Sequence, residues 1–168
     1  ANSKILPFRF LEAEKHVSAS WAKDALRGAL ELSFSNLPDI TGSTAVFLDV
    51  SGSMDGAFLK MSAVFALALI RKTDSGKLLL FDTEVTEFPY SKRDTILTQA
   101  SSIHIRGGTD TGKPFSTILR AREFYDNIIL ITDEQQNTGC SAISKFLAYR
   151  DRINPNTKLF IIDVSSYR

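Results

Sequence analysis

The chain has 168 residues, 20 Lys and Arg against 19 Asp and Glu, a formal net charge of +1 and a hydrophobic fraction of 43%. A chain of this length is expected to form one domain with a core large enough to fold without disulfides or a structural metal. The near-zero charge argues against a protein that holds nucleic acid by bulk electrostatics, and the composition excludes collagen-like and disordered classes. The single cysteine, Cys140, cannot form an intramolecular disulfide and fits a reducing compartment.

The apolar stretches are too short to cross a membrane. The longest, residues 57–70, is interrupted by Lys60 and Ser62 and falls short of the roughly 20 residues that a spanning helix needs. We therefore expect no membrane-spanning segment. The chain starts without an initiator Met or a signal-peptide pattern, which indicates a fragment of a longer protein.

The first 38 residues contain two apolar segments. Residues 4–15 are too apolar for a free tail and are expected to pack against the rest of the chain. Apolar residues between Trp21 and Phe34 are spaced i, i+3, i+4, which predicts an amphipathic helix with Trp21 in the core. Ser18 or Ser20 is expected to cap its start, and the helix is expected to end near Pro38.

Apolar runs then alternate with helical patterns. Strands are predicted at residues 44–48, 77–81, 127–132 and 158–162, with a short edge strand at 85–88. Helices are predicted at residues 58–72, 94–103, 111–124 and 141–151. Continuous Val, Ile, Leu and Phe runs separated by helices are typical of a parallel sheet that is covered on both faces. The sequence therefore predicts an α/β fold with a doubly wound, mostly parallel, Rossmann-like sheet.

Each of the four main predicted strands ends in an aspartate: Asp49, Asp82, Asp133 and Asp163. Ligands of open α/β sheets bind outside the carboxyl ends of the strands. Carboxylates that share such an edge raise each other's pKa, and a hard divalent cation would compensate for the repulsion. For any one aspartate, the alternative that it caps the following turn stays open.

The residues after Asp49 favour the metal. Asp49, Ser51 and Ser53 stand at i, i+2 and i+4 where a buried strand opens into a loop, so three oxygens can converge on one ion. Thr109, after two glycines, and Asp133, after the next long apolar run, are the candidates for the remaining ligands. We expect this set to bind Mg²⁺, or Mn²⁺ or Ca²⁺, with one coordination position open to a ligand.

This five-residue set resembles the metal-ion-dependent adhesion site (MIDAS) of von Willebrand factor A domains. In that family the two serines and the threonine ligate the ion directly, and the aspartates act directly or through water. Residues 6–10, 47–54, 107–110 and 131–134 further resemble the C-terminal A domain of Ro autoantigen (TROVE) proteins. The resemblance implies that residues 1–38 lead from a ring of helical repeats outside this chain and that residues 39–168 form the A domain.

The resemblance also implies a function. It points to a divalent-metal-dependent ligand-binding domain of an RNA-binding, ribonucleoprotein-forming protein that acts in noncoding RNA binding and quality control. Noncoding RNA would bind through the parent protein, and an acidic protein ligand or a phosphate would bind at the metal. We expect a cytoplasmic monomer. The alternative is a metal-dependent protein-interaction or adhesion A domain with no RNA role.

Catalytic motifs are incomplete, so we expect a binding protein and not an enzyme. Haloacid-dehalogenase phosphatases have a second carboxylate two residues after the strand-end aspartate, and here Ser51 occupies that place. Ser51 and Ser53 lack the Gly-x-Ser-x-Gly elbow of a nucleophile. Residues 107–113 lack the spacing of a phosphate-binding loop. Arg106 is the basic residue expected to strengthen the binding of an anion at the metal.

Overall fold

The computed structural model describes residues 7–54, 56–135, 139 and 141–164. Within these residues, five strands form one sheet in the order β3-β2-β1-β4-β5. Their bounds are β1 (Ile40–Asp49), β2 (Thr73–Phe81), β3 (Val85–Phe88), β4 (Asn127–Thr132) and β5 (Lys158–Asp163). Only β3, at one edge, is antiparallel to its neighbour. The predicted α/β class with a mostly parallel sheet is confirmed.

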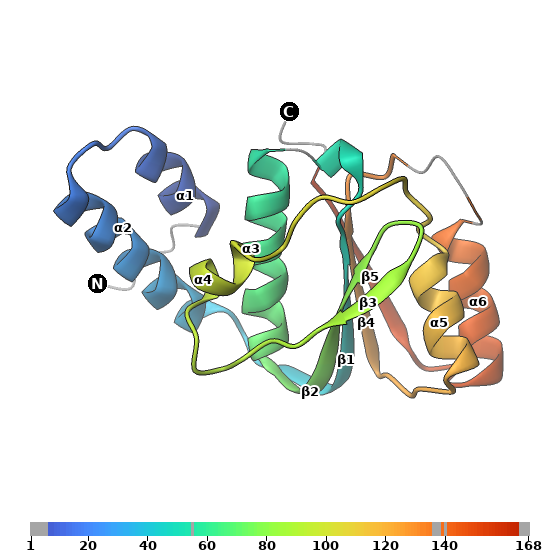
Figure 1. Cartoon of the computed structure of the whole chain (residues 1–168). Helices are drawn as coiled ribbons and strands as arrows, with labels where there is room; N and C mark the ends of the chain where they lie inside the picture. The colour runs from blue at the N-terminus through green and yellow to red at the C-terminus, as the bar shows by residue number, and fades with distance from the viewer. Residues whose placement is uncertain (1–6, 55, 136–138, 140, 165–168) are drawn as a thin grey trace.

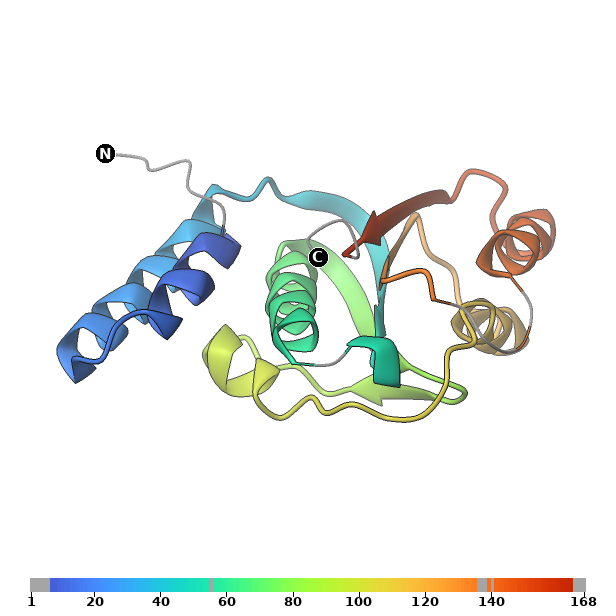
Figure 2. The same ribbon diagram turned by 90° about the horizontal axis from the view of Figure 1, so that it is seen from above.

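Helices cover both faces of the sheet (Figures 1 and 2). One face is covered by α3 (Ala57–Arg71), with the short α4 (Ile96–Ala100) beside it. The opposite face is covered by α5 (Lys113–Arg120) and α6 (Ala142–Arg152). Two 3₁₀ turns, η1 (Phe34–Asn36) and η2 (Gly52–Met54), stand before and after β1. This layering explains why the central strands are apolar on both sides.

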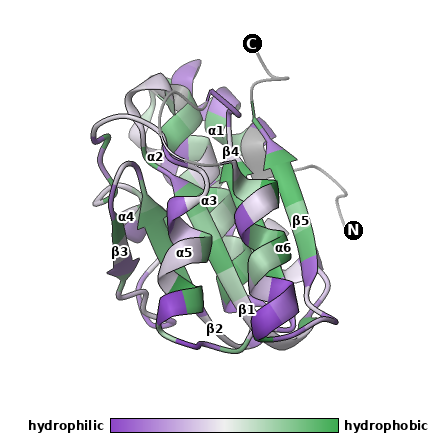
Figure 3. Cartoon of the chain, turned by 90° about the vertical axis from the view of Figure 1, so that its right-hand side faces the viewer, coloured by the Kyte–Doolittle hydropathy of each residue, from purple (hydrophilic) through white to green (hydrophobic). Residues whose placement is uncertain are grey.

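The core has two halves, one on each face of the sheet. In β1, Val46 and Leu48 belong to the half under α3, whereas Ala45 and Phe47 belong to the half under α5 and α6. Figure 3 shows the hydrophobic colouring of the strands behind α5 and α6. The ring of Phe115 meets that of Phe47 edge to face, with centroids 5.1 Å apart. Alternation of side chains along a doubly covered strand therefore yields the unbroken apolar run seen in the sequence.

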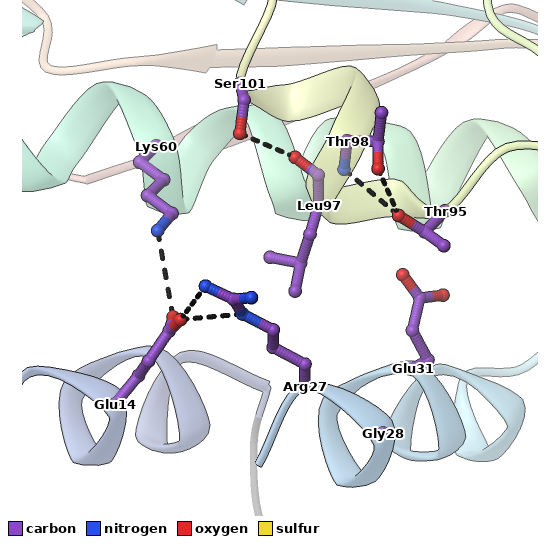
Figure 4. A pocket seen from close by; sticks show the side chains of 9 residues that line it. All are labelled: Glu14, Arg27, Gly28, Glu31, Lys60, Thr95, Leu97, Thr98 and Ser101. Carbon is purple, nitrogen blue, oxygen red and sulfur yellow. Dashed lines mark hydrogen bonds and ion pairs between the residues drawn. The ribbon is translucent and has the colours of Figure 1, made fainter. Parts of the chain in front are cut away.

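The first two helices, α1 (Pro7–Lys15) and α2 (Ser20–Ser33), form a hairpin on the outer side of α3 (Figures 1 and 2). Leu30 of α2 is buried in the core half under α3. Beside this contact, Glu14 accepts a hydrogen bond of 2.8 Å from Arg27 Nε and forms an ion pair of 3.8 Å with Lys60. These side chains line a pocket of about 500 Å³ between the hairpin, α3 and α4 (Figure 4).

Two predictions for α2 were wrong. The residue before the helix is Ala19, which offers no side-chain cap, so neither Ser18 nor Ser20 caps it. Trp21 is 77% exposed and not part of the core. The hairpin is covered on one side only, so the apolar residues of α2 that face away from α3 remain in solvent. Leu32, 74% exposed, lies on α2 in the same situation.

Several element bounds also differ from the predictions. β1 and β2 begin earlier, at Ile40 and Thr73, because polar residues before each apolar run also pair across the two strands. α4 begins only after Thr95, whose hydroxyl accepts a hydrogen bond from the Thr98 amide and caps the helix. None of the helices in the described part of the chain combines the length and apolar character that crossing a bilayer requires.

Candidate metal centre

Four of the five candidate ligands come from the carboxyl ends of two adjacent strands. Asp49 is the last residue of β1, and Asp133 directly follows β4. These strands are parallel neighbours, with Leu48 paired to Ile131, so their ends lie side by side. The chain leaving β1 turns at once through η2, which carries Ser53 (Figure 1). The topology therefore brings these residues to one edge of the sheet, as predicted.

Asp49 is fully buried, and both of its carboxylate oxygens accept hydrogen bonds. Oδ1 accepts from the Ser51 amide at 2.9 Å, and Oδ2 accepts from the Thr132 hydroxyl at 2.7 Å. Burial raises the pKa of Asp49 above its ordinary value, the bonds from Ser51 and Thr132 oppose that rise, and the charge of Asp133 adds to it. A cation beside this carboxylate would favour the charged form.

A series of contacts connects Asp49 to three other candidate ligands. Beyond the Asp49–Ser51 bond, Ser51 Oγ lies 3.1 Å from Ser53 Oγ. Ser53 Oγ in turn donates to Asp133 Oδ1 at 3.2 Å. Ser51 and Asp133 are buried and Ser53 is half-buried. Four of the five predicted residues are thus gathered into one cluster.

The fifth predicted residue, Thr109, lies in a loop that is attached to the same region. The Gly52 amide donates to the Gly107 carbonyl at 2.9 Å, and the Arg106 amide donates to the Val50 carbonyl at 2.7 Å. The Thr109 side chain is buried. These backbone bonds hold the loop against the turn that carries Ser51 and Ser53.

The structure assigns other positions to two residues that the sequence brought into consideration. Asp82 Oδ1 accepts from the Glu84 amide at 2.7 Å, and Oδ2 accepts from the Gly107 amide at 3.1 Å, so this carboxylate binds backbone groups. The guanidinium of Arg106 donates to the Thr86 hydroxyl at 2.8 Å, on the edge strand β3.

Sequence reasoning missed Thr132. Its hydroxyl both donates to Asp49 and accepts from the Glu134 amide at 3.1 Å, where the backbone takes a left-handed φ of 59°. Thr132 thereby fixes the end of β4 relative to the end of β1. Its place directly before the strand-end aspartate was visible in the sequence, but its partner across the strands was not.

The chemistry of this donor set fits a hard divalent cation. The candidate ligands are two carboxylates and three hydroxyls, and oxygen ligands are those that Mg²⁺, Mn²⁺ and Ca²⁺ prefer. No cluster of three or more His, Cys, Asp or Glu side chains is arranged for a metal in the part of the chain that the structure describes. A metal at this edge would therefore depend on the hydroxyls of Ser51, Ser53 and Thr109.

Comparison with known proteins supplies the family. A family model described as the Ro60 vWA domain matches residues 43–168, three quarters of the chain. This chain belongs to the Ro60 vWA domain family. The Ro resemblance read from the sequence is thereby confirmed. No curated protein matches the chain.

Solved structures share the fold of this Ro60-type vWA domain. The Ro (RSR) protein of Deinococcus radiodurans superposes with a TM-score of 0.78 and 20% identity, over 96% of this chain and 38% of that one. An aerotolerance-related membrane protein from Bacteroides fragilis gives a TM-score of 0.51 and 19% identity, over 71% of this chain and 64% of that one. This chain therefore spans 38% of the length of the Deinococcus protein.

Proposed function

We propose that this Ro60-type vWA domain captures an acidic ligand through a divalent cation held by Asp49, Ser51, Ser53, Thr109 and Asp133. The observation that carries the proposal is the unbroken series of contacts from Asp49 through the two serines to Asp133, built from two strand ends 80 residues or more apart in sequence. When bound, the cation supplies a positive centre with a coordination position for a ligand oxygen.

The protein holds the ligand oxygens close together and partly shielded from water. Thr132 orients the Asp49 carboxylate, the Ser53 hydroxyl is held by Asp133, and the Ser51 hydroxyl lies beside that of Ser53. Because three of the five donors are neutral hydroxyls, the ligand set carries less negative charge than a cage of carboxylates. An anionic oxygen from outside, on a protein carboxylate or a phosphate, is therefore the favoured sixth ligand.

Binding, and not turnover, is the proposed activity. The Ser51 and Ser53 hydroxyls lie beside each other and that of Ser53 donates to Asp133, an arrangement that suits ligation of a cation.

Calorimetric titration with Mn²⁺ and Mg²⁺ tests the metal. The unsubstituted chain should bind one Mn²⁺, and Asp49→Ala should abolish the binding heat. Ser62→Ala is the control. Ser62 is as fully buried as Asp49, but it lies in the middle of α3 and outside the ligand set. Equal heats for the unsubstituted chain and Asp49→Ala would overturn the proposal.

We further propose that this domain serves a Ro-type RNA-binding protein whose RNA contacts lie largely outside these 168 residues. Membership of the Ro60 vWA domain family supports an origin in a Ro-type protein. The net charge of +1 supports a weak RNA affinity of this chain. Gel shifts with single-stranded RNA test it. Weak binding that is lost as salt rises is expected, whereas tight, salt-resistant binding by this chain alone would contradict the assignment.

A further inference from the structure

We infer that Asp82 is a positioning residue of the metal centre, which holds the loop of Thr109 against the end of β1. The inference rests on the proposed function, since it concerns how the fifth ligand reaches the other four. Asp82 directly follows β2 (Thr73–Phe81) and is 7% exposed. It is one of the strand-end aspartates but not one of the candidate ligands, and its carboxylate accepts hydrogen bonds from backbone amides instead.

Asp82 binds the Thr109 loop at two points, one on each side of Thr109. Its Oδ2 accepts from the Gly107 amide at 3.1 Å, and its backbone carbonyl accepts from the Asp110 amide at 3.0 Å. Its other oxygen, Oδ1, accepts from the Glu84 amide at 2.7 Å, which fixes the carboxylate relative to the turn after β2. One residue thus connects the β2 end to both flanks of the predicted ligand.

Backbone bonds also attach this loop to the turn after β1: the Gly52 amide donates to the Gly107 carbonyl, and the Arg106 amide donates to the Val50 carbonyl. These bonds place the loop near the site, but they involve Arg106 and Gly107, which precede Thr109. The Asp82 carboxylate adds a charge-assisted bond to Gly107 in a buried setting, where such bonds are stronger than neutral ones. Substituting the Asp82 side chain removes this bond and leaves the backbone bonds of the loop in place.

Loss of this carboxylate should loosen Thr109 without removing any ligand. Groups that orient metal ligands through hydrogen bonds typically contribute about 10–100-fold to metal affinity. We therefore expect Asp82→Ala to raise the Kd for Mn²⁺ by about 10–100-fold. Asp82→Asn keeps one acceptor oxygen for one of the two amides, so its Kd should lie between those of Asp82→Ala and the unsubstituted chain.

Asp126→Ala is a control at a distance from the site. Asp126 Oδ2 also accepts a backbone amide, that of Ser43 at 2.8 Å, but at the opposite end of the sheet, where β1 and β4 begin. Its removal breaks a carboxylate–amide bond away from the site, in a more exposed setting than that of Asp82. Mn²⁺ affinity should be unchanged in this variant, so a loss of affinity common to both substitutions would indicate general destabilisation and overturn the inference.

A double-mutant cycle separates positioning from general stability. If Asp82 acts through Thr109, adding Asp82→Ala to Thr109→Ala should change the Mn²⁺ affinity by less than about twofold, because coupled residues are not additive. Independent, additive losses would overturn the inference. If Asp82→Ala does not fold, the same cycle with Asp82→Asn decides it.

Mn²⁺ binding distinguishes a failure of the proposed function from a failure of the Asp82 role. If the unsubstituted chain binds no Mn²⁺, the proposed function fails, and the role of Asp82 with it. If the unsubstituted chain binds Mn²⁺ and both Asp82 variants bind it equally well, only the role of Asp82 is overturned. Binding that weakens in the order unsubstituted chain, Asp82→Asn, Asp82→Ala supports both.

Discussion

Replacing Thr132 with valine tests the bond that joins the two strand ends of the site. The hydroxyl donates to Asp49 Oδ2 at 2.7 Å, and both residues are at most 1% exposed. Valine keeps the branched shape of the side chain but offers the carboxylate no donor. Thr132→Ser is the control, because it keeps the hydroxyl and removes only a methyl group.

The cost follows from the burial and charge of the acceptor. A hydrogen bond to a charged group contributes about 1.5–3 kcal/mol to the free energy of unfolding. When the donor is removed and the acceptor stays buried, most of that free energy is lost. The second bond of the hydroxyl, from the Glu134 amide, should cost less, because Glu134 is exposed and water can take its place. In a chain of this size, about 1.5–3 kcal/mol corresponds to a fall in Tm of about 3–12 °C.

Urea unfolding at pH 7 in the presence of a chelator measures this cost without metal, and Mn²⁺ titration measures its effect on the site. We expect Thr132→Val to lose about 1.5–3 kcal/mol of stability and about 10–100-fold in Mn²⁺ affinity. Thr132→Ser should stay close to the unsubstituted chain in both. A valine variant within about 0.5 kcal/mol of the unsubstituted chain and with the same Mn²⁺ affinity would refute the reasoning.

Two further predictions concern the rest of the fold. Leu30→Ala should cost about 2–5 kcal/mol in urea unfolding, whereas Trp21→Ala, on the exposed side of the same helix, should stay within about 0.5 kcal/mol, and equal costs would contradict the one-sided burial of α2. Burial raises the pKa of Glu123, but hydrogen bonds from Lys77 and Tyr125 outweigh it and lower the pKa below the ordinary 4.5. At pH 7 the unsubstituted chain should therefore be more stable than Glu123→Gln, and this difference should disappear as the pH falls below 4.5. A difference in stability that does not depend on pH would refute this.

The central sheet could be predicted because its signal is local. Residues 45–48 of β1 and residues 128–131 of β4 are apolar at every position, which requires cover on both faces, and helical patterns lie between the two runs. The run that became β5 looks similar in sequence, yet Phe160 and Ile161 are exposed there. An edge strand has a partner on one side only, and sequence alone does not reveal which strand stands at the edge.

The site was predictable to the extent that its spacing is local. Asp49, Ser51 and Ser53 lie within five consecutive residues, and the parallel topology of the sheet then brings Asp133 to the same edge. The supporting bonds were not predictable, because Thr132 meets Asp49 and Asp82 meets Gly107 across separate strands and loops. The predicted burial of Trp21 is wrong for a related reason, because helical spacing shows that a face is apolar but not whether anything covers it.

The most direct test of the account is anomalous diffraction from crystals of the chain soaked in Mn²⁺. The account predicts one manganese peak at the carboxyl edge of the sheet, within bonding distance of oxygens from Asp49, Ser51, Ser53, Thr109 and Asp133. A map with no peak among these side chains, or with manganese bound only elsewhere, would contradict it.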